Sequence, residues 1–232
     1  MEQDVEPRVP KCIGFITDGN RRWAKEQGLP QLEGHRAGYE KFKEIVPWAK
    51  ARGVHNLIFY GFSTENWNRT PEEVSYLMNL LRLGVTQDAD VARKENMRLR
   101  IIGQVERLAP DLQESIRKIE AETANFSDGT IALAISYGGR AEIVQAVNRI
   151  IDEKRQGPVD EKTFASYLWT HDIPDPDLVI RTGKEMRISN FLSWQSVYSE
   201  FYFTDTYWPA LSKEELYQIL DEFASRERRL GR

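Results

Sequence analysis

Short apolar runs alternate with helical patterns along almost the whole chain, and this alternation constrains the fold most. The apolar runs lie at 12–17, 56–61, 97–103, 130–136, 178–182 and 200–204. The helical patterns lie between and after them, at 34–52, 71–94, 110–123, 140–154 and 213–228. Strand–helix alternation is typical of a mainly parallel sheet that is covered on both faces. We therefore expect an α/β fold with a central sheet of about six strands flanked by helices.

The sequence favours one domain. The Gln156-Gly157-Pro158 break is too short to act as a linker, and neither a repeat nor a low-complexity tract is visible. With 232 residues, of which 41% are hydrophobic, the chain can form one large core. We expect an N-terminal tail at 1–10 and a single catalytic domain at 11–232.

Charge and cysteine content limit the class of protein. A net charge of −4 disfavours general nucleic-acid binding, so we expect no nucleic-acid partner. The single cysteine, Cys12, cannot form an internal disulfide, which fits a reducing compartment. The N-terminus lacks the apolar core of a signal peptide, and no apolar stretch approaches the length of a membrane span. We expect a cytoplasmic protein, with peripheral contact to a membrane left open.

The stretch ITDGNRRWA at 16–24 is the first indication of function. Asp18, Gly19 and Asn20 are turn formers after an apolar run, and a helix can begin at Arg21. A strand that turns into a helix leaves free N–H groups at the helix start, where an anion can bind. Arg21 and Arg22 strengthen the case for phosphate. A capped surface helix with solvated arginines remains an alternative reading of this stretch.

Polar clusters follow most of the predicted strands. They lie at 18–23, 34–36, 63–69, 137–140, 181–183 and 187–190. Because ligands of parallel sheets bind at the carboxyl ends of the strands, we expect these clusters at one edge. Arginines recur there with only two obvious acids, Asp18 and Glu65, which favours a diphosphate site with one acid for Mg²⁺. The usual nucleotide-binding glycine motifs are missing, which disfavours a nucleotide enzyme.

Together these motifs resemble those of the cis-prenyltransferase family, with undecaprenyl diphosphate synthase (isoprenyl transferase) as the closest type. The matching segments, in order, are DGNRRW at 18–23, GHRAG at 34–38, FSTENWNR at 62–69, NMRLRIIG at 96–103, YGGR at 137–140, RTG at 181–183, RISNF at 187–191, SEFYFTD at 199–205 and RERRLG at 226–231. The resemblance extends from about residue 11 to the end. It implies an apolar tunnel, which we expect between the sheet and the helix at 71–94.

The resemblance also implies an activity. Enzymes of this family lengthen an allylic diphosphate, such as farnesyl diphosphate, with isopentenyl diphosphate units, forming a cis double bond each time. Loss of the allylic diphosphate leaves negative charge that cationic groups and amides must stabilise. The resemblance further implies Mg²⁺ and a homodimer. Gly61 stands where some short-product relatives have a large residue, so we predict a medium or long product.

Three other functions remain open at this stage. A protein of the same fold could carry out a single condensation or an irregular one, and some family heterodimers contain a non-catalytic subunit. The Asp18 cluster and the C-terminal Arg229-Leu230-Gly231 segment occur together in this chain, which favours a self-sufficient homodimer.

The resemblance assigns roles to individual residues. The amides of Gly19, Asn20 and Arg21, with Arg22 and His35, would hold the allylic diphosphate. Arg181, Arg187 and Ser189, with Ile188, would hold isopentenyl diphosphate. The residues that would line the substrate site are Trp23, Ser63, Thr64, Glu65, Trp67 and Arg69. Asp18 would carry Mg²⁺, with Glu200 as a second metal-associated acid. Asn66 stands where the family is assigned a proton acceptor, and Arg229 and Gly231 would reach the neighbouring site in a dimer.

Several of these residues have structural alternatives. Asp18 could cap the following helix, and His35 could simply belong to the start of its helix. Glu65 could pair with Arg69. Glu73 completes a capping box with Thr70, and we expect no chemistry from it. The tryptophans could pack in the core or at the rim.

The chain also departs from the usual bacterial pattern. Arg21 stands where bacterial members usually have glycine, and Gln31 where many members have a phosphate-binding arginine. We hypothesise that Arg21 compensates for Gln31. Lys184 and Met186 replace the more usual glycine and histidine between the two arginine clusters.

Overall fold

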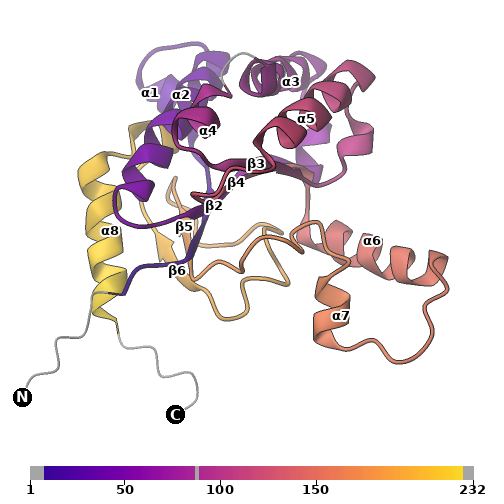
Figure 1. Cartoon of the computed structure of the whole chain (residues 1–232). Coiled ribbons are helices and arrows are strands. Elements are labelled where there is room, and N and C mark those ends of the chain that lie inside the picture. Colours follow the sequence, from indigo (N-terminus) through magenta and orange to yellow (C-terminus); the bar gives the residue numbers. More distant parts are fainter. Residues whose placement is uncertain (1–7, 87–88, 227–232) are drawn as a thin grey trace, which may run out of the picture.

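The structure is a computed structural model, which describes residues 8–86 and 89–226. Its strands are β1 (Cys12–Ile16), β2 (Asn56–Ser63), β3 (Arg98–Ile102), β4 (Thr130–Tyr137), β5 (Leu178–Arg181) and β6 (Glu200–Phe203). They form one sheet in the order β3-β4-β2-β1-β5-β6, and every neighbouring pair is parallel (Figure 1). The predicted α/β fold with a parallel six-stranded sheet is confirmed.

Helices cover the sheet on both sides. They are α1 (Asn20–Glu26), α2 (Gln31–Lys50), α3 (Pro71–Thr86), α4 (Asp90–Lys94), α5 (Pro110–Thr123), α6 (Gly139–Asp152), α7 (Glu161–Ala165) and α8 (Lys213–Ser225), with short 3-10 turns η1 (Thr64–Asn68), η2 (Val105–Arg107) and η3 (Trp208–Ala210). Figure 1 shows α3 and α5 above the sheet, and α6 and α7 below it at the far end. The sequence pattern missed α7 and predicted one helix at 71–94, where the structure has α3 and α4. None of the helices within the described residues is long and apolar enough to cross a bilayer.

The sheet separates two hydrophobic cores. Phe15 on β1 is the register partner of Phe59 on β2, and the two rings stack at 5.0 Å in the core under α2, α3, α5 and α8. The next residues along these strands, Ile16 and Tyr60, point to the second core, where Tyr60 stacks on Phe191 at 4.7 Å. Burial of both faces explains why the strands are almost continuously apolar in sequence.

The order of the strands creates a switch point between β1 and β5. The chain leaves β1 toward β2 on one side, whereas it leaves β5 toward β6 on the other side. Asp18 follows β1 by two residues, and Arg181 is the last residue of β5. Crevices for ligands form at the carboxyl ends of strands where the connections diverge in this way. The fold therefore places Asp18 and Arg181 where a ligand is expected.

Candidate functional site

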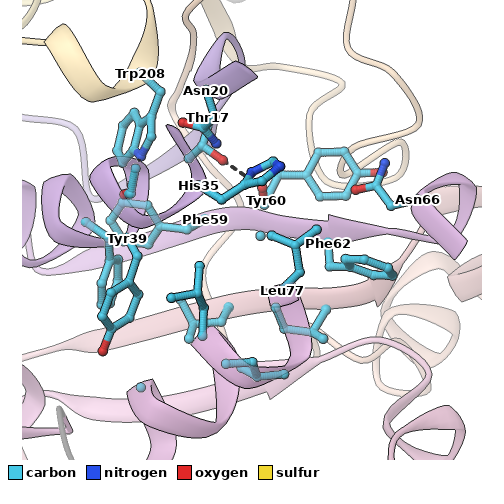
Figure 2. A pocket seen from close by; sticks show the side chains of 18 of the residues that line it. Thr17, Asn20, His35, Tyr39, Phe59, Tyr60, Phe62, Asn66, Leu77 and Trp208 are labelled. Carbon is cyan, nitrogen blue, oxygen red and sulfur yellow. Dashed lines mark hydrogen bonds between the residues drawn. The ribbon is translucent and has the colours of Figure 1, made fainter. Parts of the chain in front are cut away.

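Two adjoining cavities open at the carboxyl edge of the sheet. The deep cavity, of about 500 Å³, extends between the sheet and α3. Its polar end includes His35 and Asn66, and its interior is lined by Tyr39, Phe62 and Leu77 (Figure 2). The apolar tunnel predicted between the sheet and the helix at 71–94 therefore lies along α3.

The outer cavity, of about 560 Å³, lies beside the deep cavity, and most of the residues that line it are polar. Its lining includes Arg181, Ser189 and Asn190. The two cavities share six lining residues, which are Thr17, Asp18, Tyr60, Asn66, Arg69 and Arg187. A ligand in one cavity would therefore be adjacent to a ligand in the other.

Close packing of α1 against α2 builds the entrance of the deep cavity. A Cβ on Gly34 would lie 2.1 Å from the Asn20 carbonyl oxygen, and one on Gly38 would lie 2.4 Å from Asn20 Oδ1. Both glycines of the GHRAG motif are therefore needed for the start of α1 to approach α2. Gly19, with φ of 103°, is the N-cap of α1 and turns the chain from β1 into the helix. These contacts place the first turn of α1 beside His35.

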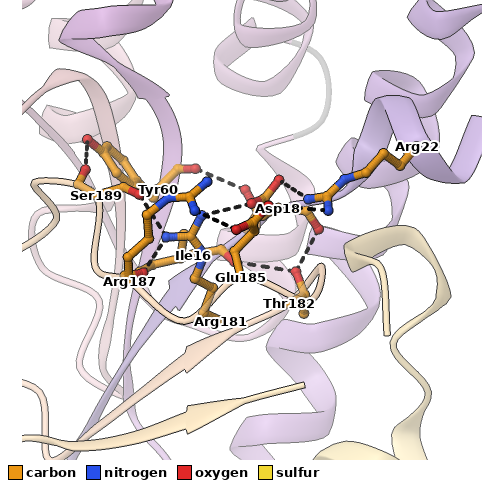
Figure 3. A network of polar contacts seen from close by, with 10 residues as sticks. Ile16, Asp18, Arg22, Tyr60, Arg181, Thr182, Glu185, Arg187 and Ser189 are labelled. Atoms are coloured by element: carbon orange, nitrogen blue, oxygen red, sulfur yellow. Dashed lines mark hydrogen bonds and ion pairs between the residues drawn. The ribbon is translucent and has the colours of Figure 1, made fainter. Parts of the chain in front are cut away.

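Asp18 lies between two guanidinium groups (Figure 3). Its Oδ1 accepts a hydrogen bond from Arg22 at 3.0 Å, and its Oδ2 accepts one from Arg181 at 2.8 Å. The backbone carbonyl of Asp18 accepts from Thr182 Oγ1 at 2.8 Å. Because Gly19 is the cap of α1, Asp18 is not a capping residue. Its side chain is 30% exposed and lines both cavities.

Arg181, Arg187 and Ser189 form what we call the loop cluster. The side chain of Arg181 is only 4% exposed, and it donates to the Arg187 carbonyl and to Ser189 Oγ. Ser189 has φ of 48°, a left-handed conformation that is uncommon for a residue other than glycine. Tyr60 Oη donates to the Ser189 carbonyl at 3.2 Å. Buried groups at the ends of β5 and β2 thus fix this part of the loop.

Asn190 connects the loop cluster to two other elements. Its carbonyl and Oδ1 accept from the N–H groups of Gly139 and Arg140, at the start of α6. Its Nδ2 donates to Glu65 at 3.1 Å. This bond and others from neighbouring groups lower the pKa of Glu65 in spite of partial burial. The predicted alternative in which Glu65 pairs with Arg69 is wrong, because Arg69 pairs with Glu73 instead.

Arg21, His35, Arg69 and Glu73 form what we call the helix cluster. Glu73 Oε1 lies 2.9 Å from His35 Nε2 and 3.0 Å from Arg69 Nη1, and its Oε2 lies 3.6 Å from Arg21 Nη1. The Glu73 side chain is 10% exposed and lies behind the other three residues, which line the deep cavity. Burial lowers the pKa of His35, although the Glu73 carboxylate opposes this effect.

The prediction for Glu73 was therefore incomplete. Thr70 Oγ1 accepts the Glu73 N–H at 3.3 Å, as a capping box requires. The Glu73 carboxylate, however, contacts His35, Arg69 and Arg21 rather than the backbone of Thr70. The capping motif concealed a buried acid beside three phosphate-binding candidates.

Asn66 lines both cavities at the end of β2. Its Oδ1 accepts the Ser63 N–H at 3.1 Å, so the oxygen is already engaged as an acceptor. Ser63 and Glu65, from the same motif, line the outer cavity. Among the predicted allylic-site residues, Gly19, Asn20 and Arg22 line the deep cavity together with Arg21 and His35.

Five predicted site residues lie outside the lining of both cavities, namely Trp23, Thr64, Trp67, Ile188 and Glu200. Trp67 Nε1 donates to Ser136 Oγ at 2.9 Å, and the ring packs against the first core. Ile188 packs against the second core. The alternative of core packing thus describes Trp67 better than a substrate contact.

Glu200 does not lie with Asp18 in this chain. Glu200 begins β6 and is in register with Leu178, the first residue of β5. Asp18 instead lies past the level of Arg181, the last residue of β5. The two ends of β5 are three residue steps apart, which corresponds to roughly 10 Å. The Glu200 carboxylate instead pairs with Arg8 at 2.7 Å and with Arg226 at 3.3 Å. A shared metal site of Asp18 and Glu200 within one chain is therefore not formed.

Asp18 alone nevertheless fits a Mg²⁺ site. Within the described part of the chain, no group of three or more His, Cys, Asp or Glu side chains could hold a metal ion. Mg²⁺ is commonly bound through one or two carboxylates, with substrate phosphates and waters as the other ligands. A partly exposed carboxylate between two phosphate-binding candidates suits a metal that arrives with its substrate.

The residues at which this chain departs from the usual bacterial pattern lie in different parts of the structure. Arg21 is half exposed and lines the deep cavity, whereas Gln31 is exposed at the first position of α2. Lys184 has φ of 70°, which the glycine more usual in the family would adopt freely, and Met186 is 79% exposed. The predicted Arg229 and Gly231 lie outside the described residues.

Sequence reasoning missed four residues of the site. They are Tyr60, Glu73, Glu185 and Asn190. Glu185 pairs with Arg187 and lies 3.7 Å from Arg22, so it belongs to the polar network around Asp18. Asn190 lies inside the RISNF motif, and Tyr60 lies two positions before the motif at 62–69. This closeness to a motif is the one sequence feature that could have identified them. Their roles depend on long-range hydrogen bonds that the sequence does not reveal.

Comparisons with known proteins give one consistent result. The family described as "Putative undecaprenyl diphosphate synthase" matches residues 16–231. The isoprenyl transferase of Thermotoga maritima is 41% identical over 227 residues, which are 97% of each chain. The tritrans,polycis-undecaprenyl-diphosphate synthase (geranylgeranyl-diphosphate specific) of Thermoplasma volcanium is 43% identical over 240 residues, which are 100% of this chain and 93% of the relative.

A solved structure extends the likeness to three dimensions. The lavandulyl diphosphate synthase from Lavandula x intermedia, in complex with dimethylallyl diphosphate, superposes with a TM-score of 0.91 at 32% identity. The match covers 97% of this chain and 99% of that protein. It agrees with the sequence resemblance on which the site residues were predicted.

Proposed function

The chain belongs to the undecaprenyl diphosphate synthase family, and we propose that it is a cis-prenyltransferase that adds isopentenyl diphosphate units to an allylic diphosphate. One observation carries the proposal. Asp18 lies between Arg22 at the deep cavity and Arg181 at the outer cavity, and only the deep cavity extends into an apolar interior. This is the arrangement that two diphosphate substrates need when one of them carries a long hydrocarbon tail.

In this proposal the allylic diphosphate binds at the helix cluster. Arg21, Arg22 and His35 line the entrance of the deep cavity, together with the first amides of α1. The hydrocarbon tail extends between the sheet and α3, past Phe62 and Leu77. Burial of apolar surface there contributes roughly 25 cal/mol per Å² to binding.

Isopentenyl diphosphate binds at the loop cluster. Arg181 and Arg187 supply guanidinium groups, and Ser189 supplies a hydroxyl, on the wall of the outer cavity. Guanidinium groups suit phosphate because they form paired, charge-assisted hydrogen bonds. The shared residues Asp18 and Asn66 place the two substrates side by side.

The chain's own residues contribute mainly electrostatics to the reaction. Breakage of the allylic carbon–oxygen bond increases the negative charge on the departing diphosphate, which Arg21, Arg22 and Arg69 face. Asn66 is a poor proton acceptor because a neutral amide is a weak base and its Oδ1 already binds the Ser63 N–H. We therefore assign to a diphosphate oxygen the removal of the proton from C2 of the added isopentenyl unit, whose C–H electrons form the new cis double bond.

Asp18 is the residue that would hold Mg²⁺ on the isopentenyl diphosphate. The ion, when bound, supplies positive charge that neutralises the phosphate oxygens. Asp18 also orients Arg22 and Arg181, so it connects the first turn of α1 with the loop cluster even without the ion.

Product length depends on the wall of the deep cavity. A Cβ on Gly61 would lie 2.9 Å from Ile135 Cδ1, so Ile135 occupies the space beside this glycine. Gly61 alone therefore does not decide the length, and our proposal of a medium or long product rests on the extent of the apolar lining. Farnesyl and geranylgeranyl diphosphates are both candidate starters, the latter because of the specificity of the Thermoplasma volcanium relative.

We also propose a homodimer in which Arg229 and Gly231 reach the neighbouring site, with peripheral membrane contact when the product is released. Size-exclusion chromatography with light scattering tests the first point, and sedimentation with lipid vesicles tests the second.

The function is tested with purified protein, labelled isopentenyl diphosphate, Mg²⁺ and either starter. We expect products that contain several added units, and a loss of activity of about 10³-fold in Asp18→Ala. A product with a single added unit would instead support the same-fold single-condensation enzyme, and an irregular linkage would support the irregular synthase. Absence of any product from the folded homodimer would support a non-catalytic subunit.

A further inference from the structure

The helix cluster contains the one imidazole within the lining of the two cavities, and it is backed by a buried acid. The side chains of His35 and Glu73 are 5% and 10% exposed, and His35 Nε2 lies 2.9 Å from Glu73 Oε1. A carboxylate can only accept hydrogen bonds, so Nε2 carries the proton in this pair. The other nitrogen, Nδ1, is then the one that can gain a proton or bind a ligand.

The charges around this pair favour a neutral imidazole in the protein without substrate. Glu73 of α3 faces His35 together with Arg69, which precedes α3, and Arg21 of α1. Two guanidinium groups and one carboxylate give the cluster one net positive charge while the imidazole is neutral. Burial favours the neutral imidazole and so lowers the pKa of His35.

A bound diphosphate reverses this balance because it brings several negative charges next to the cluster. An opposite charge within about 4–6 Å moves a pKa by roughly 1–3 units toward the charged form. The Glu73 carboxylate stabilises the imidazolium from the other side, as a carboxylate does for a histidine that must change its charge.

We propose that Glu73 positions His35 to take up a proton when a diphosphate enters the deep cavity. The cluster then adds a positive charge on substrate binding and returns the proton to solvent when pyrophosphate departs. Glu73 acts as a positioning residue, because it lies behind His35 and outside the cavity lining. The inference rests on the proposed function, since it requires a diphosphate at the helix cluster.

The chain offers a direct experiment because it contains only three histidines. Protein labelled with ¹⁵N-histidine gives three sets of ring signals, and His35→Asn identifies the set that belongs to His35. Titration with and without saturating inorganic pyrophosphate should show a rise in the His35 pKa of about one unit or more. His55 and His171 bond to backbone carbonyls elsewhere, so their ring signals should not respond to pyrophosphate and serve as the internal control for an intact fold.

Two variants separate positioning from a structural role. Glu73→Gln keeps the shape and can still accept from Nε2, but it removes the charge that supports the imidazolium. We expect it to reduce the pyrophosphate-induced rise by at least half. Glu72→Gln removes an exposed acid from the same turn of α3 and should behave like the wild type.

The outcomes distinguish the two proposals. If pyrophosphate inhibits elongation competitively while the His35 titration stays unchanged, the inference is overturned and the proposed function stands. An equal rise in wild type and Glu73→Gln would overturn the role of Glu73. If pyrophosphate neither changes the His35 signals nor inhibits elongation, both the inference and the placement of the allylic diphosphate fail.

Discussion

The helix cluster and the loop cluster both adjoin the cavities that Asp18 lines, but they are built differently. The helix cluster has residues from α1, α2 and the start of α3, and a buried acid holds it from behind. The loop cluster lies on an irregular segment after β5, and a buried arginine holds the Arg187 carbonyl and Ser189, whose backbone is left-handed. Arg21, His35 and Arg69 of the helix cluster all line the deep cavity, whereas Arg187 is the one residue of the loop cluster that does. Arg181 and Ser189 line the outer cavity alone.

This difference indicates which substrate belongs to which cluster. A growing chain needs a site continuous with apolar space, and the deep cavity provides it. The unit that is replaced in each cycle needs no such space. A loop that exchanges its ligand repeatedly must still hold a fixed geometry, which the hydrogen bonds of Arg181 provide.

Arg181→Gln tests the assignment of isopentenyl diphosphate to the loop cluster, and we expect the largest effect on activity from it. The variant leaves Asp18 without its nearest partner and releases the Arg187 carbonyl and Ser189. Truncating one partner of a buried charge pair costs about 3–5 kcal/mol, so kcat/KM for isopentenyl diphosphate should fall by about 10²-fold or more. The KM for the allylic substrate should stay within about threefold.

Steady-state kinetics with each substrate varied in turn measure this difference. Arg187→Gln is the matched control, because the Arg187 side chain is 60% exposed and should matter less than Arg181. Equal increases in both KM values would break the assignment of the loop cluster to one substrate.

The next largest effect is expected for Glu73→Gln, on the opposite substrate. The substitution removes the negative charge that Arg21, Arg69 and His35 share, so the KM for the allylic diphosphate should rise about tenfold. The KM for isopentenyl diphosphate should change little. Glu72→Gln, which alters an exposed acid beside it, should change neither value. A selective rise in the isopentenyl KM would contradict the comparison.

The sequence predicted the sheet and the location of the site, for identifiable physical reasons. Apolar runs such as 12–17 and 130–136 are short and doubly buried, which distinguishes them from amphipathic helices such as α5. Parallel order then requires Asp18 and Arg181 to meet at one edge. Their ion pair was not predicted, because it depends on β1 and β5 being neighbours in the sheet.

The sequence could not predict the residues behind the site. Glu73 and Thr70 satisfy a local capping rule, and the contacts to His35 span 38 positions of sequence. Glu200 belongs to a family motif, but its partners Arg8 and Arg226 depend on how both ends of the chain meet β6. Local patterns do not encode such distant contacts.

A smaller effect is expected from the wall of the deep cavity. Ile135→Ala removes a side chain that lines this cavity beside Gly61 and should shift the product distribution toward longer chains. It should destabilise the fold by about 2 kcal/mol or more, as buried isoleucine truncations do. The KM for isopentenyl diphosphate should stay unchanged.

Chromatography of dephosphorylated products measures the shift. Ile131→Ala is the matched control, because Ile131 is fully buried on the same strand outside the lining of the cavity. It should lower stability without changing product length. If both variants lengthen the product, general loosening rather than the cavity wall decides the length.

The smallest effect that we expect is on the pH dependence of stability, in which the two clusters differ. Arginines of the loop cluster keep their charge, whereas His35 of the helix cluster has a lowered pKa in the folded protein. The unfolded chain therefore binds more protons near the ordinary histidine pKa of 6.5, and stability decreases as the pH falls below that value. His35→Asn should flatten this part of the profile, and His55→Asn, at an exposed position, should not. Urea unfolding between pH 5 and 8 measures the slopes. An unchanged slope in His35→Asn would show that the burial of this imidazole does not contribute to the pH dependence, and it would remove the titratable difference between the clusters.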